Sequence, residues 1–270
     1  MFLLLFGCFL ADTGLSGTLC AKELSNESDK FADFIFERSL FEENRETGMQ
    51  ESHFPRVKLL IVDMDNTLCD TFHTLSVPKW KKVAMQLKGK GWGYLIPKID
   101  KYFGRYSFVQ SMRLAGMNKE QMQFAIEHYN DTDVASLKLF PDAFPLLELP
   151  IPKILLSRGH KPVQDSKIKH LQLRPYFEKI VIVDSFETKD KAIEQALVDY
   201  EIEPQEALII GDRMDEEIAI GKRLNIPTVL VKRTEVPLTY RFKPDMIVHS
   251  LRTLVNKLKG LRSSFTQWKV

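Results

Sequence analysis

Two aspartates separated by one residue follow a short apolar run of the chain. Asp63 and Asp65 come directly after residues 59–62, which are all leucine, isoleucine or valine. In extended geometry residues i and i+2 point to one side, so both carboxylates could face one pocket. Such a pair can bind a hard cation, and one member can attack while the other moves protons. The alternative is a turn in which aspartate and asparagine only cap the next helix.

A hydroxyl and a glycine follow a second apolar run. Ser157, Arg158 and Gly159 come directly after residues 154–156. A glycine loop of this kind presents backbone N–H groups to an anion. Taken alone it is weak support for a site, because strand ends often carry serine and glycine.

Two lysines lie at the start of a helix-like segment. Lysine at a helix N-terminus opposes the helix macrodipole, so local stability does not explain Lys189 or Lys191. For either one, a solvated surface lysine is the alternative. The spacing to Ala192 and Ala196 fits Lys189 better than Lys191.

An acidic turn follows a further apolar run. Gly211 and Asp212 begin it, and Asp215, Glu216 and Glu217 come after them. Acids just past a strand suit a metal site. They also suit a helix N-terminus, where the macrodipole favours negative charge.

The elements that must position these residues are short apolar strands separated by helices. The expected strands lie at 59–62, 154–156, 180–183, 207–210, 229–231 and 246–248, and the later helices at 163–171, 191–200 and 216–224. Apolar strands without alternation, joined by helices, indicate a parallel sheet covered on both faces. The sequence therefore predicts a doubly wound, Rossmann-like α/β fold, in which ligands bind beyond the carboxyl ends of the strands.

A long stretch separates the first strand from the second and contains helix-like segments of its own. One of them begins at Asn118, with Gln121 in the position of a capping box. We therefore expect an inserted helical subdomain. The predicted parts are an apolar leader at 1–21, a polar and partly helical extension at 22–56, a core at 57–71 and 141–258, the insert at 72–140 and a tail at 259–270.

The composition excludes several classes of protein. The 44% hydrophobic content, with 13 Gly and 13 Pro, is unlike collagen-like, coiled-coil or wholly disordered chains. The 38 Lys and Arg against 36 Asp and Glu leave a charge of +2, which argues against a general nucleic-acid binder. The 3 cysteines lack metal-ligand spacing and cannot form a disulfide framework.

The apolar run at 2–11 bears on location. It is too short to span a bilayer, so we expect no transmembrane span. No lysine or arginine precedes it, which favours a cytoplasmic protein over a signal peptide. If residues 1–21 do act as a signal, the protein is secreted or periplasmic. The sequence leaves the oligomeric state open.

The motifs, taken together and in this order, resemble those of the haloacid dehalogenase-like (HAD) hydrolase superfamily. The matching residues are Asp63, Asp65 and Thr67, then Ser157, then Lys189, and finally Gly211 and Asp212. The resemblance covers residues 58 to about 258 and implies that the insert is the family's helical cap, which closes over the active site and selects the leaving group.

The resemblance implies a role for each aspartate. Asp63 would be the nucleophile that forms an aspartyl-phosphate, and Asp65 the general acid and base. Mg²⁺ would bind the Asp63 carboxylate, the Asp65 main-chain carbonyl and Asp212. The family usually has a second aspartate after Asp212. Glu216 and Glu217 occupy the corresponding positions, and the spacing favours Glu217 as the metal ligand.

The resemblance also implies the phosphate site. Thr67, Ser157, Arg158 and Gly159 would hold the phosphoryl oxygens, and Lys189 would neutralise their charge in the transition state.

An acid at position 65 indicates phosphate chemistry, because the family's dehalogenases lack an acid there and its ion pumps carry threonine. The leading hypothesis is a magnesium-dependent phosphatase for a small phosphorylated metabolite. Two alternatives stay open: a phosphomutase of the same superfamily, and a phosphate-binding regulatory protein without turnover.

Overall fold

The structure, a computed structural model, describes residues 57–184, 187–233 and 242–266. The expected leader at 1–21 and the polar extension at 22–56 lie outside the described residues. Within the described ranges, no helix is both long and apolar enough to cross a membrane.

Six parallel strands form one sheet in the order β3-β2-β1-β4-β5-β6. The strands are β1 (Leu59–Val62), β2 (Lys153–Arg158), β3 (Lys179–Val183), β4 (Ala207–Gly211), β5 (Thr228–Val231) and β6 (Met246–Val248). Each coincides with an apolar run in the sequence. The doubly wound α/β fold that these runs predict is therefore confirmed.

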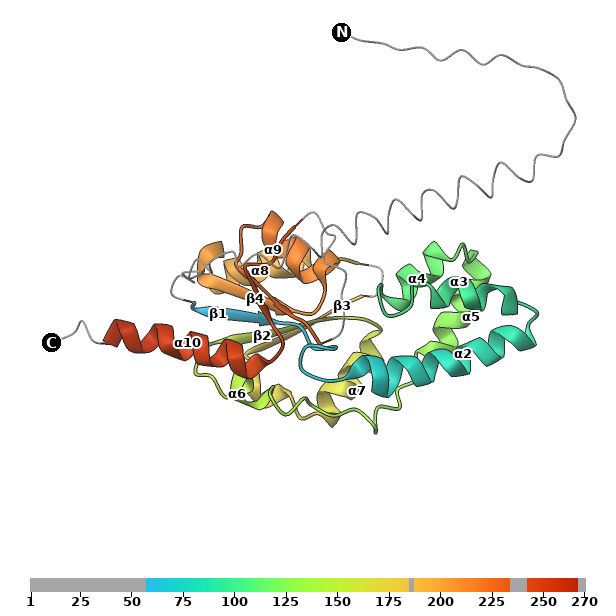
Figure 1. The fold of residues 1–270 in the computed structure, drawn as a ribbon, viewed down its shortest axis with the longest axis horizontal. Helices are drawn as coiled ribbons and strands as arrows, with labels where there is room; N and C mark the ends of the chain where they lie inside the picture. The colour runs from blue at the N-terminus through green and yellow to red at the C-terminus, as the bar shows by residue number, and fades with distance from the viewer. Residues whose placement is uncertain (1–56, 185–186, 234–241, 267–270) are drawn as a thin grey trace, which may run out of the picture. The chain divides into compact units, whose positions relative to one another are not determined.

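Helices cover both faces of the sheet, which is why its strands are apolar throughout. Leu60 and Val62 of β1 pack into one hydrophobic cluster, whereas Leu59 and Ile61 pack into another on the opposite face. The first face carries α6 (Phe144–Leu147), α7 (Lys161–His170) and α10 (Leu251–Thr266), and the second carries α8 (Asp190–Asp199) and α9 (Ala219–Arg223) (Figure 1). Burying one such side chain contributes about 1.5–3 kcal/mol, so the two clusters hold β1 firmly.

Several helix boundaries differ from expectation. The helix predicted at 216–224 begins earlier, as the π-helical turn η5 (Met214–Ile218), and continues as α9. Helix α10 extends to Thr266, so the predicted start of a tail at 259 falls inside it. Two short 3₁₀ turns, η3 (Arg174–Tyr176) and η4 (Pro204–Glu206), complete the described connections of the core.

The insert between β1 and β2 is helical and has a hydrophobic cluster of its own, which includes Trp80, Val83 and Met112. Asn118 and Gln121 form the capping box expected from the sequence. The separate cluster means that the insert packs as a unit beside the sheet. Its elements are η1 (Phe72–Ser76), α2 (Val77–Gly89), η2 (Gly93–Leu95), α3 (Ile96–Asp100), α4 (Phe108–Leu114) and α5 (Lys119–Tyr129).

Candidate active site

The loop after β1 turns sharply and presents its aspartates at the edge of the sheet. The Asp63 N–H still donates to the carbonyl of Ile210 at 2.9 Å, as in the preceding strand. Asn66 then adopts a φ of 58°, a left-handed conformation that asparagine tolerates better than most residues. Its Oδ1 accepts a hydrogen bond from the Phe72 N–H at 2.8 Å, which joins the loop to the start of the insert.

The register of the sheet brings the sequence motifs to one edge. Val62 is aligned with Leu155 of β2 on one side and with Ile210 of β4 on the other. The residues that follow these three strands therefore meet at the carboxyl edge, as expected for this fold.

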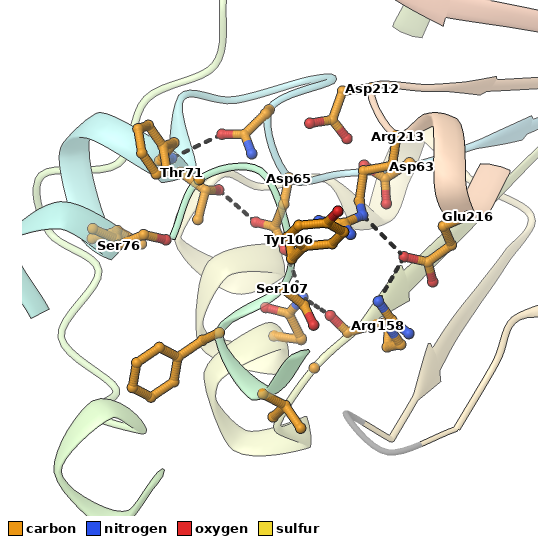
Figure 2. A pocket seen from close by; sticks show the side chains of 18 of the residues that line it. Asp63, Asp65, Thr71, Ser76, Tyr106, Ser107, Arg158, Asp212, Arg213 and Glu216 are labelled. Carbon is orange, nitrogen blue, oxygen red and sulfur yellow. Dashed lines mark hydrogen bonds and ion pairs between the residues drawn. The ribbon is translucent and has the colours of Figure 1, made fainter. Parts of the chain in front are cut away.

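A cavity of about 710 Å³ opens at this edge and is also lined by residues of the insert (Figure 2). Six of the predicted site residues line it, namely Asp63, Asp65, Arg158, Gly159, Lys189 and Asp212. Thr67, Ser157 and Glu217 are buried and do not line it in the described structure.

Lys189 lies at the N-cap of α8 and reaches Asp63. Its Nζ is 2.6 Å from Asp63 Oδ1 and 2.5 Å from Glu217 Oε1, and all three side chains are buried. Lys191, the other candidate, is exposed. The two buried ion pairs offset the cost of placing a lysine at a helix N-terminus.

One lysine does not balance the negative charge around it. Burial raises the pKa of Asp63 to about 7: the attraction of Lys189 is outweighed by burial together with repulsion from Glu217 and Asp65. Burial, with repulsion from Asp63 and Glu217, likewise raises the pKa of Asp212 well above its usual range. The site therefore has a deficit of positive charge.

Some buried carboxylate oxygens in this region lack a hydrogen-bond partner. Asp63 Oδ2 and Glu217 Oε2 are two of them. In the described residues no three His, Cys, Asp or Glu side chains converge closely enough to enclose a metal. Two carboxylates, Asp63 and Asp212, with the Asp65 carbonyl still suit Mg²⁺, which usually retains several waters. Glu217 differs from these two acids, because it does not line the cavity in the described structure.

Asp65 is held by three side chains that the sequence motifs did not indicate. Lys167 Nζ lies 2.8 Å and Thr71 Oγ1 2.5 Å from Asp65 Oδ1, and Gln164 Nε2 lies 2.8 Å from Oδ2. Although burial opposes it, the charge of Lys167 and these hydrogen bonds lower the pKa of Asp65. The only signal in the sequence is that Gln164 and Lys167, three residues apart, share a helix face.

The predicted phosphate-binding residues do not all reach the cavity: Arg158 and Gly159 line it, whereas Thr67 and Ser157 are buried. Ser157 Oγ accepts a hydrogen bond from Gln164 at 2.7 Å, behind the cavity wall. Thr67 Oγ1 is buried without a hydrogen-bond partner, and the Thr67 carbonyl accepts from Arg233 at 3.2 Å. Arg158 faces the cavity, where its Nη2 lies 2.9 Å from Glu216 Oε2.

Charged groups line one side of the cavity and aromatic rings of the insert line the other. Arg213 lies beside the same glutamate as Arg158, at 3.6 Å from Glu216 Oε2, and Figure 2 shows Glu216 between the two arginines. On the insert, Phe108 stacks on Tyr129 with ring centroids 4.0 Å apart, and both line the cavity. An anionic group with a less polar remainder fits such a cavity.

Comparisons with known proteins identify related chains. A family model described as haloacid dehalogenase-like hydrolase matches residues 60–231. A glyceraldehyde 3-phosphate phosphatase from Pyrococcus furiosus is 25% identical over 226 residues, which are 76% of this chain and 94% of that protein. The protein of the same name from Pyrococcus abyssi is 24% identical over 65% of this chain and 82% of its own length.

Solved structures share the fold. A haloacid dehalogenase-like hydrolase from Streptococcus pneumoniae has a TM-score of 0.60 at 20% identity, covering 75% of this chain and 98% of its own. A HAD hydrolase from Bacillus subtilis bound to magnesium has a TM-score of 0.53 at 14% identity, covering 76% and 99%. With the family match over most of the chain, the chain belongs to the haloacid dehalogenase-like hydrolase family, as a hydrolase of the phosphatase type.

Proposed function

We propose that this hydrolase is a magnesium-dependent phosphatase that cleaves a small phosphorylated metabolite through an aspartyl-phosphate on Asp63. The arrangement around Asp63 carries the proposal. One of its oxygens is paired with Lys189 at 2.6 Å, while the other, Oδ2, has no hydrogen-bond partner and its side chain lines the cavity. A buried carboxylate with a free oxygen suits both attack on phosphorus and binding of a cation.

The first half of the reaction uses both aspartates. An Asp63 oxygen forms a bond to phosphorus as the bond between phosphorus and the leaving oxygen breaks. Asp65 gives its proton to that leaving oxygen, which departs as an alcohol. Lys189 stabilises the charge that spreads over the phosphoryl oxygens. When bound, Mg²⁺ reduces the repulsion between the anionic substrate and the carboxylates.

The second half regenerates the enzyme. Asp65, now ionised, takes a proton from a water molecule as the water oxygen bonds to phosphorus. The bond from phosphorus to Asp63 breaks, and inorganic phosphate leaves. Lys167 and the hydrogen bonds to Asp65 favour its ionised form, which is the form this step requires.

The names of the relatives suggest the first substrate to test. Those relatives are glyceraldehyde 3-phosphate phosphatases, and we propose a phosphorylated metabolite of that size or somewhat larger. The cavity of about 710 Å³ lies within the usual range for small-molecule sites. Its aromatic wall on the insert would contact the leaving group, and we propose that the insert acts as the cap.

Phosphate release tests the proposal. The purified chain is assayed with p-nitrophenyl phosphate and glyceraldehyde 3-phosphate, with Mg²⁺ and with a chelator. We expect magnesium-dependent release of phosphate by the parent chain and none by Asp63→Asn. The Asp212→Ala variant should need a much higher Mg²⁺ concentration than the parent to release phosphate. Asp199→Asn is the matched control. Asp199 is the last residue of α8, and it is paired with Lys179 of β3. If Asp63→Asn released phosphate at the parent rate, Asp63 would be ruled out as the nucleophile.

A further inference from the structure

Helix α7 directs two buried polar side chains toward the aspartate after the nucleophile. Lys167 is 6% exposed and Gln164 is 2% exposed. Lysine is almost never this buried unless it is paired, and a buried glutamine needs hydrogen-bond partners. Their burial therefore requires a partner, and both reach Asp65.

The two residues hold both oxygens of that carboxylate. Lys167 Nζ lies 2.8 Å from Asp65 Oδ1, and Gln164 Nε2 lies 2.8 Å from Oδ2. Because both oxygens accept hydrogen bonds, the carboxylate cannot rotate without breaking one of them. The Gln164 nitrogen also lies 2.7 Å from Ser157 Oγ, so one amide links Asp65 to the end of β2.

The glycine after β2 makes this contact possible. A Cβ on Gly159 would lie 3.1 Å from both Cδ and Nε2 of Gln164, closer than ordinary van der Waals contact. The absence of a side chain at Gly159 lets Gln164 reach forward to Asp65 and Ser157. Gln164 therefore contacts both Ser157 and Asp65, and Lys167 contacts Asp65 from the same helix.

We propose that Lys167 and Gln164 are positioning residues that hold the Asp65 carboxyl group toward the leaving oxygen of the substrate. The inference rests on the proposed function, in which Asp65 protonates that oxygen. A general acid acts only within hydrogen-bond reach of its acceptor. Loss of either side chain removes one of the contacts that fix the Asp65 carboxyl group, so the group is held less firmly and departure of a poor leaving group slows.

Substrates that differ in their need for a proton test this role. Glyceraldehyde 3-phosphate is an alkyl phosphate, whose leaving group departs as an alkoxide unless its oxygen is protonated. The leaving group of 2,4-dinitrophenyl phosphate is a phenolate that is stable without a proton. The value of kcat/KM reports the steps up to release of the leaving group. For Lys167→Met and Gln164→Leu we expect a loss of about 10–100-fold with the alkyl phosphate, part of the 10²–10⁴-fold typical of general acids. With the dinitrophenyl ester we expect little change.

Lys161→Met is the matched control. Lys161 lies in the first turn of the same helix and is paired with Asp165 on the surface at 2.8 Å, so its loss should leave both values unchanged. The ratio of the two kcat/KM values does not depend on the fraction of folded enzyme. A variant that folds poorly therefore still reports on positioning.

The outcomes separate the two proposals. A selective loss with the alkyl phosphate supports positioning. An equal loss on both substrates, or no loss on either, overturns the roles of Lys167 and Gln164 while the phosphatase proposal stands. If the parent chain releases phosphate from neither substrate with Mg²⁺ present, the proposed function itself is wrong.

Discussion

Replacing Lys189 with methionine should destabilise the protein strongly. Methionine keeps most of the side-chain volume but removes the charge between Asp63 and Glu217. The ammonium group lies 2.6 Å and 2.5 Å from these two carboxylates, and all three groups are buried. Breaking a buried pair by removing one partner costs about 3–5 kcal/mol, because the other charge stays buried and unpaired. For a domain of this size, we expect the melting temperature to fall by on the order of 10 °C.

Urea denaturation without Mg²⁺ measures the effect, and two further variants interpret it. Lys191→Met, on the same helix but exposed, should change the free energy of unfolding by less than about 0.5 kcal/mol. Adding Glu217→Gln to Lys189→Met should restore part of the loss, because it removes one of the orphaned charges. If Lys189→Met costs no more than Lys191→Met, the buried ion pairs do not hold the site together.

Two other predictions concern the same cluster. A Cβ on Gly211 would lie 2.3 Å from Glu217 Cγ, so Gly211→Ala should displace Glu217 and lower the free energy of unfolding by about 1–3 kcal/mol. Gly89→Ala, where nothing lies within 4 Å, is the control in urea denaturation and should show no loss. The pKa of Asp63 is about 7 in the folded protein and about 3.9 when unfolded. The folded state therefore binds this proton more tightly, and without Mg²⁺ the stability relative to Asp63→Asn should fall as pH rises through that window. Mg²⁺ should reduce the fall, and a difference between the two proteins that is constant with pH would contradict the assignment.

Much of the core was predictable from the sequence, because its signals are local. Six apolar runs without alternation became six parallel strands. The pair Asn118 and Gln121 marks a helix start through contacts three residues apart. Asp63 and Asp65 needed only the period of an extended chain to share a pocket. In each case the structure follows from interactions or backbone geometry within a few neighbouring residues.

The surroundings of Asp65 were not predictable in this way. Lys167 and Gln164 follow it by about a hundred residues, and their roles depend on how α7 packs beneath the sheet. The ion pair between Glu217 Oε1 and Lys189 was not predicted either, and it depends on the missing side chain at Gly211. Such contacts depend on tertiary packing, and one sequence carries no direct signal for them.

The central place of β1 in the sheet has a consequence for how the chain folds. Its hydrogen-bonding neighbours are β2 and β4, which the chain reaches only after the helical insert and, for β4, after β3 and α8 as well. Contacts so distant in sequence form slowly, because the intervening chain loses entropy when they close. During synthesis the insert can gather its own local contacts first. The strand that leads into Asp63 obtains its second neighbour only once residue 211 is available, so the candidate site is completed late in folding.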